Sequence, residues 1–224
     1  MYNLFRKNRN SDSNLKLHDE IYSSYSEFTM IPPATFKANL ELCTRFREVQ
    51  GCVVECGVWR GGMIAGIASI LGAERTYYLF DSFEGLPSVT DIDGPDAHKW
   101  QNDKDSPYYF DNCRAEIGFA KEAMQRTGCV NVNLIKGWFN ETTANFIANS
   151  PIAILRLDGD WYESTMVCLE NLYPQVAKNG VIIIDDYYVW DGCSRAVHDY
   201  LSKNSLPVRI KTFKDVCYIE KTHE

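Results

Sequence analysis

The stretch VVECGVWRGG at residues 53–62 shows how this chain is built. It starts inside the apolar run Cys52–Cys56, turns at Gly57 and continues into the helical pattern Gly61–Leu71. Glycines in such a turn let the backbone approach a bound group closely, and the free N–H groups of a helix start favour negative or electron-rich atoms. The spacing E-x-G-x-x-x-G differs from the dinucleotide fingerprint G-x-G-x-x-G. A turn with a purely structural role also fits these residues.

Strand and helix patterns alternate along the rest of the chain. Short apolar runs predict strands at Cys52–Cys56, Thr76–Asp81, Val132–Ile135, Ile152–Asp158 and Val181–Asp185. Helical patterns lie at residues 33–46, Gly61–Leu71, Tyr109–Thr127, Glu141–Ala148, Tyr162–Ala177 and Cys193–Lys203. Runs that are apolar almost throughout are typical of strands buried on both faces of a parallel sheet. The alternation predicts a doubly wound, Rossmann-like α/β sheet that binds ligands at the carboxyl ends of its strands.

The segments outside this alternation define the domain organisation. The runs Pro207–Phe213 and Val216–Lys221 are joined by a two-residue link and predict an antiparallel hairpin, which gives a seven-stranded, mostly parallel sheet. Residues 1–30 are expected to form a flexible N-terminal arm, and residues 31–224 a single domain. The long irregular stretch near residues 83–107 is rich in Asp, Gly and Pro, and we expect it to be a lid insertion.

Composition excludes several classes of protein. The 224 residues include 23 Lys and Arg against 30 Asp and Glu, which gives a formal charge of −7 with no basic cluster. Binding to nucleic acid is therefore not expected, and no run approaches the roughly 18 apolar residues of a membrane span. Eight cysteines occur without a C-x-x-C pair, which favours reduced thiols over a zinc site. These features predict a cytoplasmic protein that binds neither nucleic acid nor membranes.

Acidic residues follow three of the predicted strands. Asp81 ends the strand after the glycine turn, where a carboxylate can accept both hydroxyl protons of a ribose, although a turn or helix-cap role also fits. Asp158 and Asp160 follow one later strand, and residues 185–186, both Asp, follow the next. Like charges gathered at one sheet edge are costly unless a cation neutralises them, and oxygen ligands select Mg²⁺, Mn²⁺ or Ca²⁺. Capping of the following helix by Asp160, and a solvent-facing Asp186, are the structural alternatives.

Five segments taken together resemble one family. They are ECGVWRGG (55–62), FDSFEGLP (80–87), KGWF (136–139), LDGDWYEST (157–165) and DDYY (185–188). In this order they resemble the macrocin O-methyltransferase (TylF-like) family, and the match runs from about residue 30 to the C-terminus. The resemblance implies a class I methyltransferase that uses S-adenosylmethionine and a divalent metal, usually Mg²⁺, to methylate a sugar hydroxyl on a small-molecule or glycan acceptor. It also makes a homo-oligomer possible.

The resemblance implies roles for individual residues. The metal ligands would be Asp158, Asp185 and Asp186. The cofactor contacts would be Glu55, Gly57, Gly61, Asp81, Ser82, Gly137, Trp138 and Asp158. Among them, Ser82 would lie beside the ribose and the Gly137–Trp138 pair near the adenine.

The chemistry of methyl transfer agrees with these roles. The methyl group of S-adenosylmethionine is already activated, so the weak nucleophilicity of a neutral hydroxyl limits the reaction. A bound cation lowers the pKa of that hydroxyl and so makes it a better nucleophile. Asp158 is expected to be essential for turnover. His98, within residues 96–100 of the expected lid, is the candidate general base, although an exposed loop histidine also fits. The alternatives are a metal-dependent hydrolase or phosphatase on a similar sheet, and a non-catalytic S-adenosylmethionine-binding protein.

Overall fold

The computed structural model describes residues 15–223, in which a seven-stranded sheet has the order β3-β2-β1-β4-β5-β7-β6. The strands are β1 Cys52–Cys56, β2 Tyr77–Asp81, β3 Val132–Lys136, β4 Ile152–Leu157, β5 Val176–Ile184, β6 Ile210–Phe213 and β7 Val216–Glu220. Strands β1 to β5 are parallel, and β7 is antiparallel to both β5 and β6. The predicted mostly parallel sheet with a C-terminal hairpin is confirmed. Positive φ angles at Lys214 and Asp215 give the tight turn of that hairpin.

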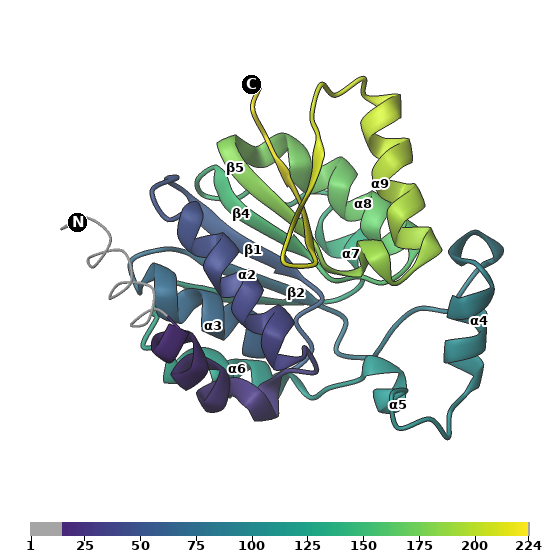
Figure 1. Ribbon diagram of the computed structural model, residues 1–224, viewed down its shortest axis with the longest axis horizontal. Coiled ribbons are helices and arrows are strands. Elements are labelled where there is room, and N and C mark those ends of the chain that lie inside the picture. The colour runs from purple at the N-terminus through teal and green to yellow at the C-terminus, as the bar shows by residue number, and fades with distance from the viewer. Residues whose placement is uncertain (1–14, 224) are drawn as a thin grey trace, which may run out of the picture.

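Helices cover both faces of the sheet, as a doubly wound fold requires (Figure 1). One layer contains α2 Pro33–Arg45, α3 Gly62–Leu71 and α6 Ile117–Arg126, and the other contains α7 Phe139–Thr142, α8 Tyr162–Leu172 and α9 Asp191–Lys203. Two separate hydrophobic clusters fill the spaces between these layers and the sheet. All ten residues of β1 and β2 except Asp81 are buried, which explains their nearly continuous apolar sequences.

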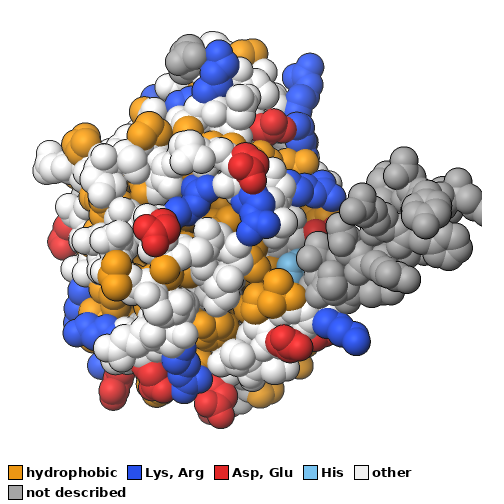
Figure 2. Space-filling model, turned by 90° about the vertical axis from the view of Figure 1, so that its left-hand side faces the viewer, with side chains coloured by type: hydrophobic (Ala, Val, Ile, Leu, Met, Phe, Trp, Pro, Cys, Tyr) orange, Lys and Arg blue, Asp and Glu red, His pale blue; other side chains and the backbone are white. Residues whose placement is uncertain are grey.

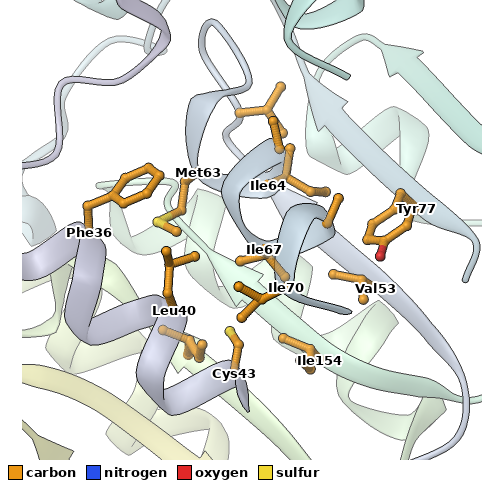
Figure 3. Close-up of a cluster of buried hydrophobic side chains, with 14 of the residues drawn as sticks. Phe36, Leu40, Cys43, Val53, Met63, Ile64, Ile67, Ile70, Tyr77 and Ile154 are labelled. Atoms are coloured by element: carbon orange, nitrogen blue, oxygen red, sulfur yellow. The ribbon is translucent and has the colours of Figure 1, made fainter. Parts of the chain in front are cut away.

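Helix α2 packs closely on α3 in the first of these clusters. Phe36, Leu40 and Cys43 are fully buried, as their helical spacing predicts, and they face the apolar side chains of α3 (Figure 3). A Cβ atom at Gly66 of α3 would lie 2.6 Å from the ring of Phe36. Glycine at this position therefore permits the short distance between the two helices.

The chain before α2 differs from the expected arm. Residues 15–25 are helical, and the short 3₁₀ helix η1 Ser26–Phe28 follows. Ile21, Tyr25 and Phe28 are buried in the same cluster as α2 and α3. Their spacing of four and three residues puts them on one helical face, and burial of that face stabilises the segment. The part of the expected arm at residues 1–14 lies outside the described residues.

Several element boundaries also differ from the sequence pattern. The helix expected over Tyr109–Thr127 is confined to α6, because Phe110–Cys113 (α5) has positive φ angles. The helix expected to reach Ala177 ends at Leu172, and Pro174 follows in the 3₁₀ helix η3 Tyr173–Gln175. The helix expected over Glu141–Ala148 is only one turn long, in α7.

The segment expected to form a lid contains the 3₁₀ helix η2 Asp91–Asp93 and helix α4 Pro95–Asn102. It stands at one side of the sheet beside α5 (Figure 1). Asp93 is 3% exposed and docks the segment, because its Oδ1 accepts the N–H of Tyr162 at the start of α8, at 2.7 Å. Its Oδ2 accepts the N–H and the hydroxyl of Thr90, each at 2.8 Å.

Charged side chains and cysteines are distributed as follows. On the face drawn in Figure 2, acidic and basic side chains are interspersed with apolar ones. All eight cysteines are free, and six of them are buried. Within residues 15–223, none of the helices combines the length and the apolar composition needed to cross a membrane.

Candidate active site

A cavity of about 1430 Å³ opens at the carboxyl ends of the parallel strands. Most of the residues predicted to form the site line it together. They are Gly57, Asp81, Ser82, Gly137, Trp138, Asp158, Asp185 and Asp186. Three predicted residues, Glu55, Gly61 and His98, are not among the residues that line it. The topology therefore brings the segments that follow all five parallel strands to one cavity, as expected for an open parallel sheet.

The glycine turn after β1 is held tightly against the end of β4. Gly57 has a φ of +85°, and a Cβ atom there would lie 1.7 Å from the carbonyl oxygen of Asp158. The N–H of Asp158 donates to the carbonyl of Cys56 at 2.9 Å, which joins the two strand ends. Gly61 has a φ of +82° at the start of α3, where a Cβ would lie 3.0 Å from Ala120. Gly57 thus shapes the cavity floor, whereas Gly61 allows α3 to pack on α6.

The carboxylate of Asp81 stabilises this turn. Its Oδ2 accepts the backbone N–H groups of Val58 and Trp59, both at 2.8 Å, and its Oδ1 accepts the N–H of Phe83 at 2.6 Å. Burial raises the pKa of Asp81, and these three donors oppose that rise. A carboxylate oxygen accepts about two hydrogen bonds, so Oδ1 retains capacity for a ligand hydroxyl. Ser82 beside it shapes the next turn, since its Oγ donates to the carbonyl of Gly85 at 2.9 Å.

Three aspartates at the ends of β4 and β5 form a compact carboxylate cluster. One oxygen from each of Asp158, Asp160 and Asp186 lies within 4.8 Å of the others. The N–H of Asp160 donates to Oδ2 of Asp186 at 2.9 Å, and Asp160 adopts a positive φ of 58°. The indole N–H of Trp190 donates to Oδ1 of Asp160 at 2.8 Å. Asp160 therefore occupies the place in this cluster that the sequence assigned to Asp185.

The protonation of the cluster reflects its burial and crowding. Burial raises the pKa of Asp158 to about 6 and that of Asp160 to about 8, with the neighbouring carboxylates adding to the rise for both. Burial, followed by Asp160 and Asp158, raises the pKa of Asp186 well above its usual range. Mutual repulsion of this kind is relieved by a cation.

A buried arginine lies directly beneath the cluster. Arg156 is 1% exposed, and its Nη1 donates to Oε1 of Glu55 at 2.6 Å and to Oδ2 of Asp158 at 2.7 Å. Its Nη2 is 2.5 Å from Oδ1 of Asp185, so that Asp185 forms an ion pair. Burial raises the pKa of Glu55 to about 7, against the opposing effect of Arg156. Glu55 thus contacts Arg156 and does not line the cavity, whereas the sequence analysis expected it to contact the cofactor.

The donor set fits a hard divalent cation. Asp158, Asp160 and Asp186 supply only carboxylate oxygens, the ligands that Mg²⁺, Mn²⁺ and Ca²⁺ prefer. The glycine turn, Asp81 and the partly buried Trp138 line the same cavity, and the Oδ1 of Asp81 can accept a hydroxyl such as that of a ribose.

Three tryptophans pack together at one side of the cavity, and two of them, Trp100 and Trp190, line it. The ring centroids of Trp161 and Trp190 are 5.3 Å apart, and each is 6.0 Å from Trp100 of α4. The indole N–H of Trp161 donates to the carbonyl of Pro87 at 3.0 Å. The residues before and within α4 are therefore fixed to the carboxylate end of the site by aromatic packing.

His98 lies apart from the carboxylate cluster. Its Nε2 is 3.7 Å from Oδ1 of Asp91, a fully exposed carboxylate in the same segment. The structure does not bring this expected base to the cavity.

Sequence reasoning missed Arg156 and Asp93. Arg156 interrupts the apolar strand sequence ILRL, and a charge at a buried strand position signals a buried ion pair. Asp93 had no comparable signal, because its partner Tyr162 is 69 residues away.

A sheet of the order β3-β2-β1-β4-β5-β7-β6, with a cavity at the carboxyl ends of its parallel strands, is the fold of the class I methyltransferases. The chain belongs to the macrocin O-methyltransferase (TylF) family, whose model matches residues 17–219. The O-methyltransferase NovP has a similar structure, with a TM-score of 0.70, 30% identity and coverage of 88% of this chain and 83% of that one.

Sequence relatives share the same type of activity by name. A Streptomyces olivaceus protein named 8-demethyl-8-(2,3-dimethoxy-alpha-L-rhamnosyl)-tetracenomycin-C 4'-O-methyltransferase is 37% identical over 171 residues, which cover 72% of this chain. The mycinamicin III 3''-O-methyltransferase of Micromonospora griseorubida is 35% identical over 184 residues, 75% of this chain. The matches span 63% and 68% of these two relatives' lengths.

Proposed function

We propose that this chain transfers the methyl group of S-adenosylmethionine to a sugar hydroxyl of a glycosylated small molecule, with the help of a divalent cation, Mg²⁺ in the simplest case. The observation that carries the proposal is that one cavity contains both the glycine turn with Asp81 and the cluster of Asp158, Asp160 and Asp186. A hydrolase or phosphatase would leave the glycine turn and Asp81 without a role. The relatives named above are O-methyltransferases, in agreement with the proposal.

The residues of the cofactor half would have distinct tasks. Asp81 would accept a ribose hydroxyl through Oδ1, while its Oδ2 keeps the turn after β1 closed. The Gly137–Trp138 pair would lie against the adenine. Gly137 donates its N–H to the carbonyl of Asp81 at 3.0 Å, which places the pair next to the residue that would bind the ribose. Together these contacts would direct the methyl group towards the ends of β4 and β5.

The residues of the acceptor half would hold and deprotonate the hydroxyl. A divalent cation bound by Asp158, Asp160 and Asp186 would supply Lewis-acid assistance to that oxygen. Asp158 is the residue we assign to the proton transfer, because it lines the cavity as a member of the cluster, whereas His98 does not line the cavity. Apolar side chains at the cavity rim, among them Met30, Ile31 and the exposed Val189, would accept the aglycone.

Two measurements test the proposal. Calorimetric titration should show saturable binding of S-adenosylmethionine and no binding of NAD. Methyl transfer is then assayed with Mg²⁺ on mycinamicin III and demethyldecarbamoylnovobiocin, the acceptors in the names of two relatives. Absence of S-adenosylmethionine binding in a folded sample would overturn the proposal.

Two variants assign the base. Asp158→Asn should lower turnover at least about 100-fold while the Kd for S-adenosylmethionine changes little, because general-base assistance contributes about 10²–10⁴-fold. His98→Ala should lower turnover less than tenfold. A larger loss of turnover in His98→Ala than in Asp158→Asn would show that His98, in the segment containing α4, is the base.

A further inference from the structure

We infer that Glu55 is a positioning residue for the cation site, acting through Arg156, and that it makes no contact with the cofactor. The inference rests on the proposed function, because it concerns the same carboxylate cluster. Glu55 belongs to the glycine-turn motif of the sequence, where a cofactor contact was expected. Its side chain is 1% exposed, is not among the residues that line the cavity, and contacts Arg156 of β4.

The contact between the two residues follows from the sheet register. Glu55 of β1 and Arg156 of β4 are direct neighbours across the parallel pair, so their side chains emerge on the same face of the sheet. Nη1 of Arg156 is 2.6 Å from Oε1 of Glu55 and 2.7 Å from Oδ2 of Asp158. One guanidinium nitrogen is thus shared between a carboxylate outside the cavity and a carboxylate of the cluster.

The remaining contact of Arg156 extends this arrangement to β5. Its Nη2 is 2.5 Å from Oδ1 of Asp185, the residue directly before the cluster member Asp186. Arg156 therefore fixes the carboxylates at the ends of both β4 and β5, which sets the spacing of the oxygens available to a cation. A planar guanidinium is suited to this task because its five donors lie in a fixed geometry.

The charge of Glu55 determines how strongly Arg156 opposes a cation. Arg156 is positive and lies next to the cluster, so it repels a divalent ion and competes with it for Asp158, while its second aspartate, Asp185, is not a member of the cluster. Glu55 neutralises part of that positive charge from the side remote from the cavity. Loss of the Glu55 charge should leave Arg156 bound more firmly to the two aspartates and weaken cation binding.

The test compares Mn²⁺ and S-adenosylmethionine affinities in wild type and Glu55→Gln. Mn²⁺ binding is followed by electron paramagnetic resonance and cofactor binding by calorimetry, both at pH 8. We expect the Kd for Mn²⁺ to rise about fivefold or more in Glu55→Gln, with less than a twofold change in the Kd for S-adenosylmethionine. Thr143→Val is the control, because Thr143 is equally buried and hydrogen-bonds to Phe139 and Asn171.

A second variant covers the case in which Glu55→Gln does not fold. Arg156→Lys keeps the charge but offers a single nitrogen to three carboxylates, so the Kd for Mn²⁺ should again rise while cofactor affinity is unchanged. Glu55→Asp should bind Mn²⁺ more tightly than Glu55→Gln, because it retains the negative charge.

The possible outcomes separate this inference from the proposed function. Equal Mn²⁺ affinity in wild type and Glu55→Gln, or a loss confined to S-adenosylmethionine affinity, would overturn the inference and leave the methyltransferase proposal intact. Absence of Mn²⁺ binding in the wild type would instead overturn the metal part of the proposed function together with the inference.

Discussion

Nη1 of Arg156 lies 2.6 Å from Oε1 of Glu55, and both side chains are 1% exposed. The pair joins the central strands β1 and β4 and supports the carboxylate cluster from below. Burial of an ion pair costs desolvation free energy that the attraction between the charges offsets only when both partners are present. The two residues are therefore expected to depend on each other for stability as well as to shape the site.

Removal of the arginine alone should be strongly destabilising. Arg156→Met leaves Glu55 buried without its counter-charge, and breaking a buried pair in this way costs about 3–5 kcal/mol. The double variant Glu55→Gln, Arg156→Met should recover part of that loss, because residue 55 is then neutral, while Asp158 and Asp185 still lack their partner. Urea unfolding of the metal-free proteins measures both changes. Equal destabilisation by the single and the double variant would contradict this interdependence.

The stability of the metal-free protein should fall as the pH rises. Burial raises the folded-state pKa of Glu55 to about 7 and that of Asp160 to about 8, above the values of these groups in an unfolded chain. The folded protein then binds more protons than the unfolded protein between about pH 4 and 8, so the free energy of unfolding decreases across this range.

Thermal unfolding in EDTA measures this effect. The Tm at pH 8 should lie below that at pH 5 by about 4 °C or more, since 1 kcal/mol corresponds to about 2–4 °C in a chain of this size. Addition of Mg²⁺ at pH 8 should reverse the loss, because a cation neutralises the ionised cluster. A higher Tm at pH 8 than at pH 5 in EDTA would show that the cluster does not control the pH dependence.

Gly57→Ala should damage both the fold and the cofactor site. The added Cβ would lie 1.7 Å from the carbonyl oxygen of Asp158, and no side-chain rotation relieves a clash with backbone. Gly128→Ala is the matched control, because Gly128 also has a positive φ but has nothing within 4 Å of the added Cβ. The control should lose only about 1–2 kcal/mol of unfolding free energy, because alanine is strained at a positive φ.

Urea unfolding and calorimetry distinguish the two glycines. We expect a larger loss of unfolding free energy in Gly57→Ala than in Gly128→Ala, and a loss of S-adenosylmethionine binding in the former only. Similar results for both variants would mean that the close contact between β1 and β4 is not required.

Asp93→Ala should release the segment that contains η2 and α4. Asp93 is buried and accepts the N–H of Tyr162 at the start of α8, and removal of such a capping contact costs about 0.5–2 kcal/mol. Hydrogen exchange across residues 88–102 should accelerate. Asp91→Ala, a change at an exposed residue of the same helix η2, should leave exchange unchanged. Equal hydrogen-exchange rates in both variants would indicate that packing of Trp100, and not Asp93, holds the segment in place.

The sequence determined much of the fold because the signals are local. Apolar runs predicted the five parallel strands, the two-residue link predicted the hairpin, and the helical spacing of Phe36, Leu40 and Cys43 predicted the buried face of α2. The boundaries were less well predicted where local conformation changes the pattern, as at the positive φ angles of Phe110–Cys113. The apolar spacing of Ile21, Tyr25 and Phe28 was present in the sequence and was overlooked.

For the site, the sequence by itself determined which segments meet, because the carboxyl ends of parallel strands always share one edge of the sheet. Gly57, Asp81, Asp158 and Asp186 all line the cavity for that reason. Only the tertiary structure decided which side chains face the cavity and which face each other. Glu55 and Asp185 contact Arg156, and Asp160 joins the cluster, because cross-strand register and one positive φ angle set these contacts between residues up to 101 positions apart.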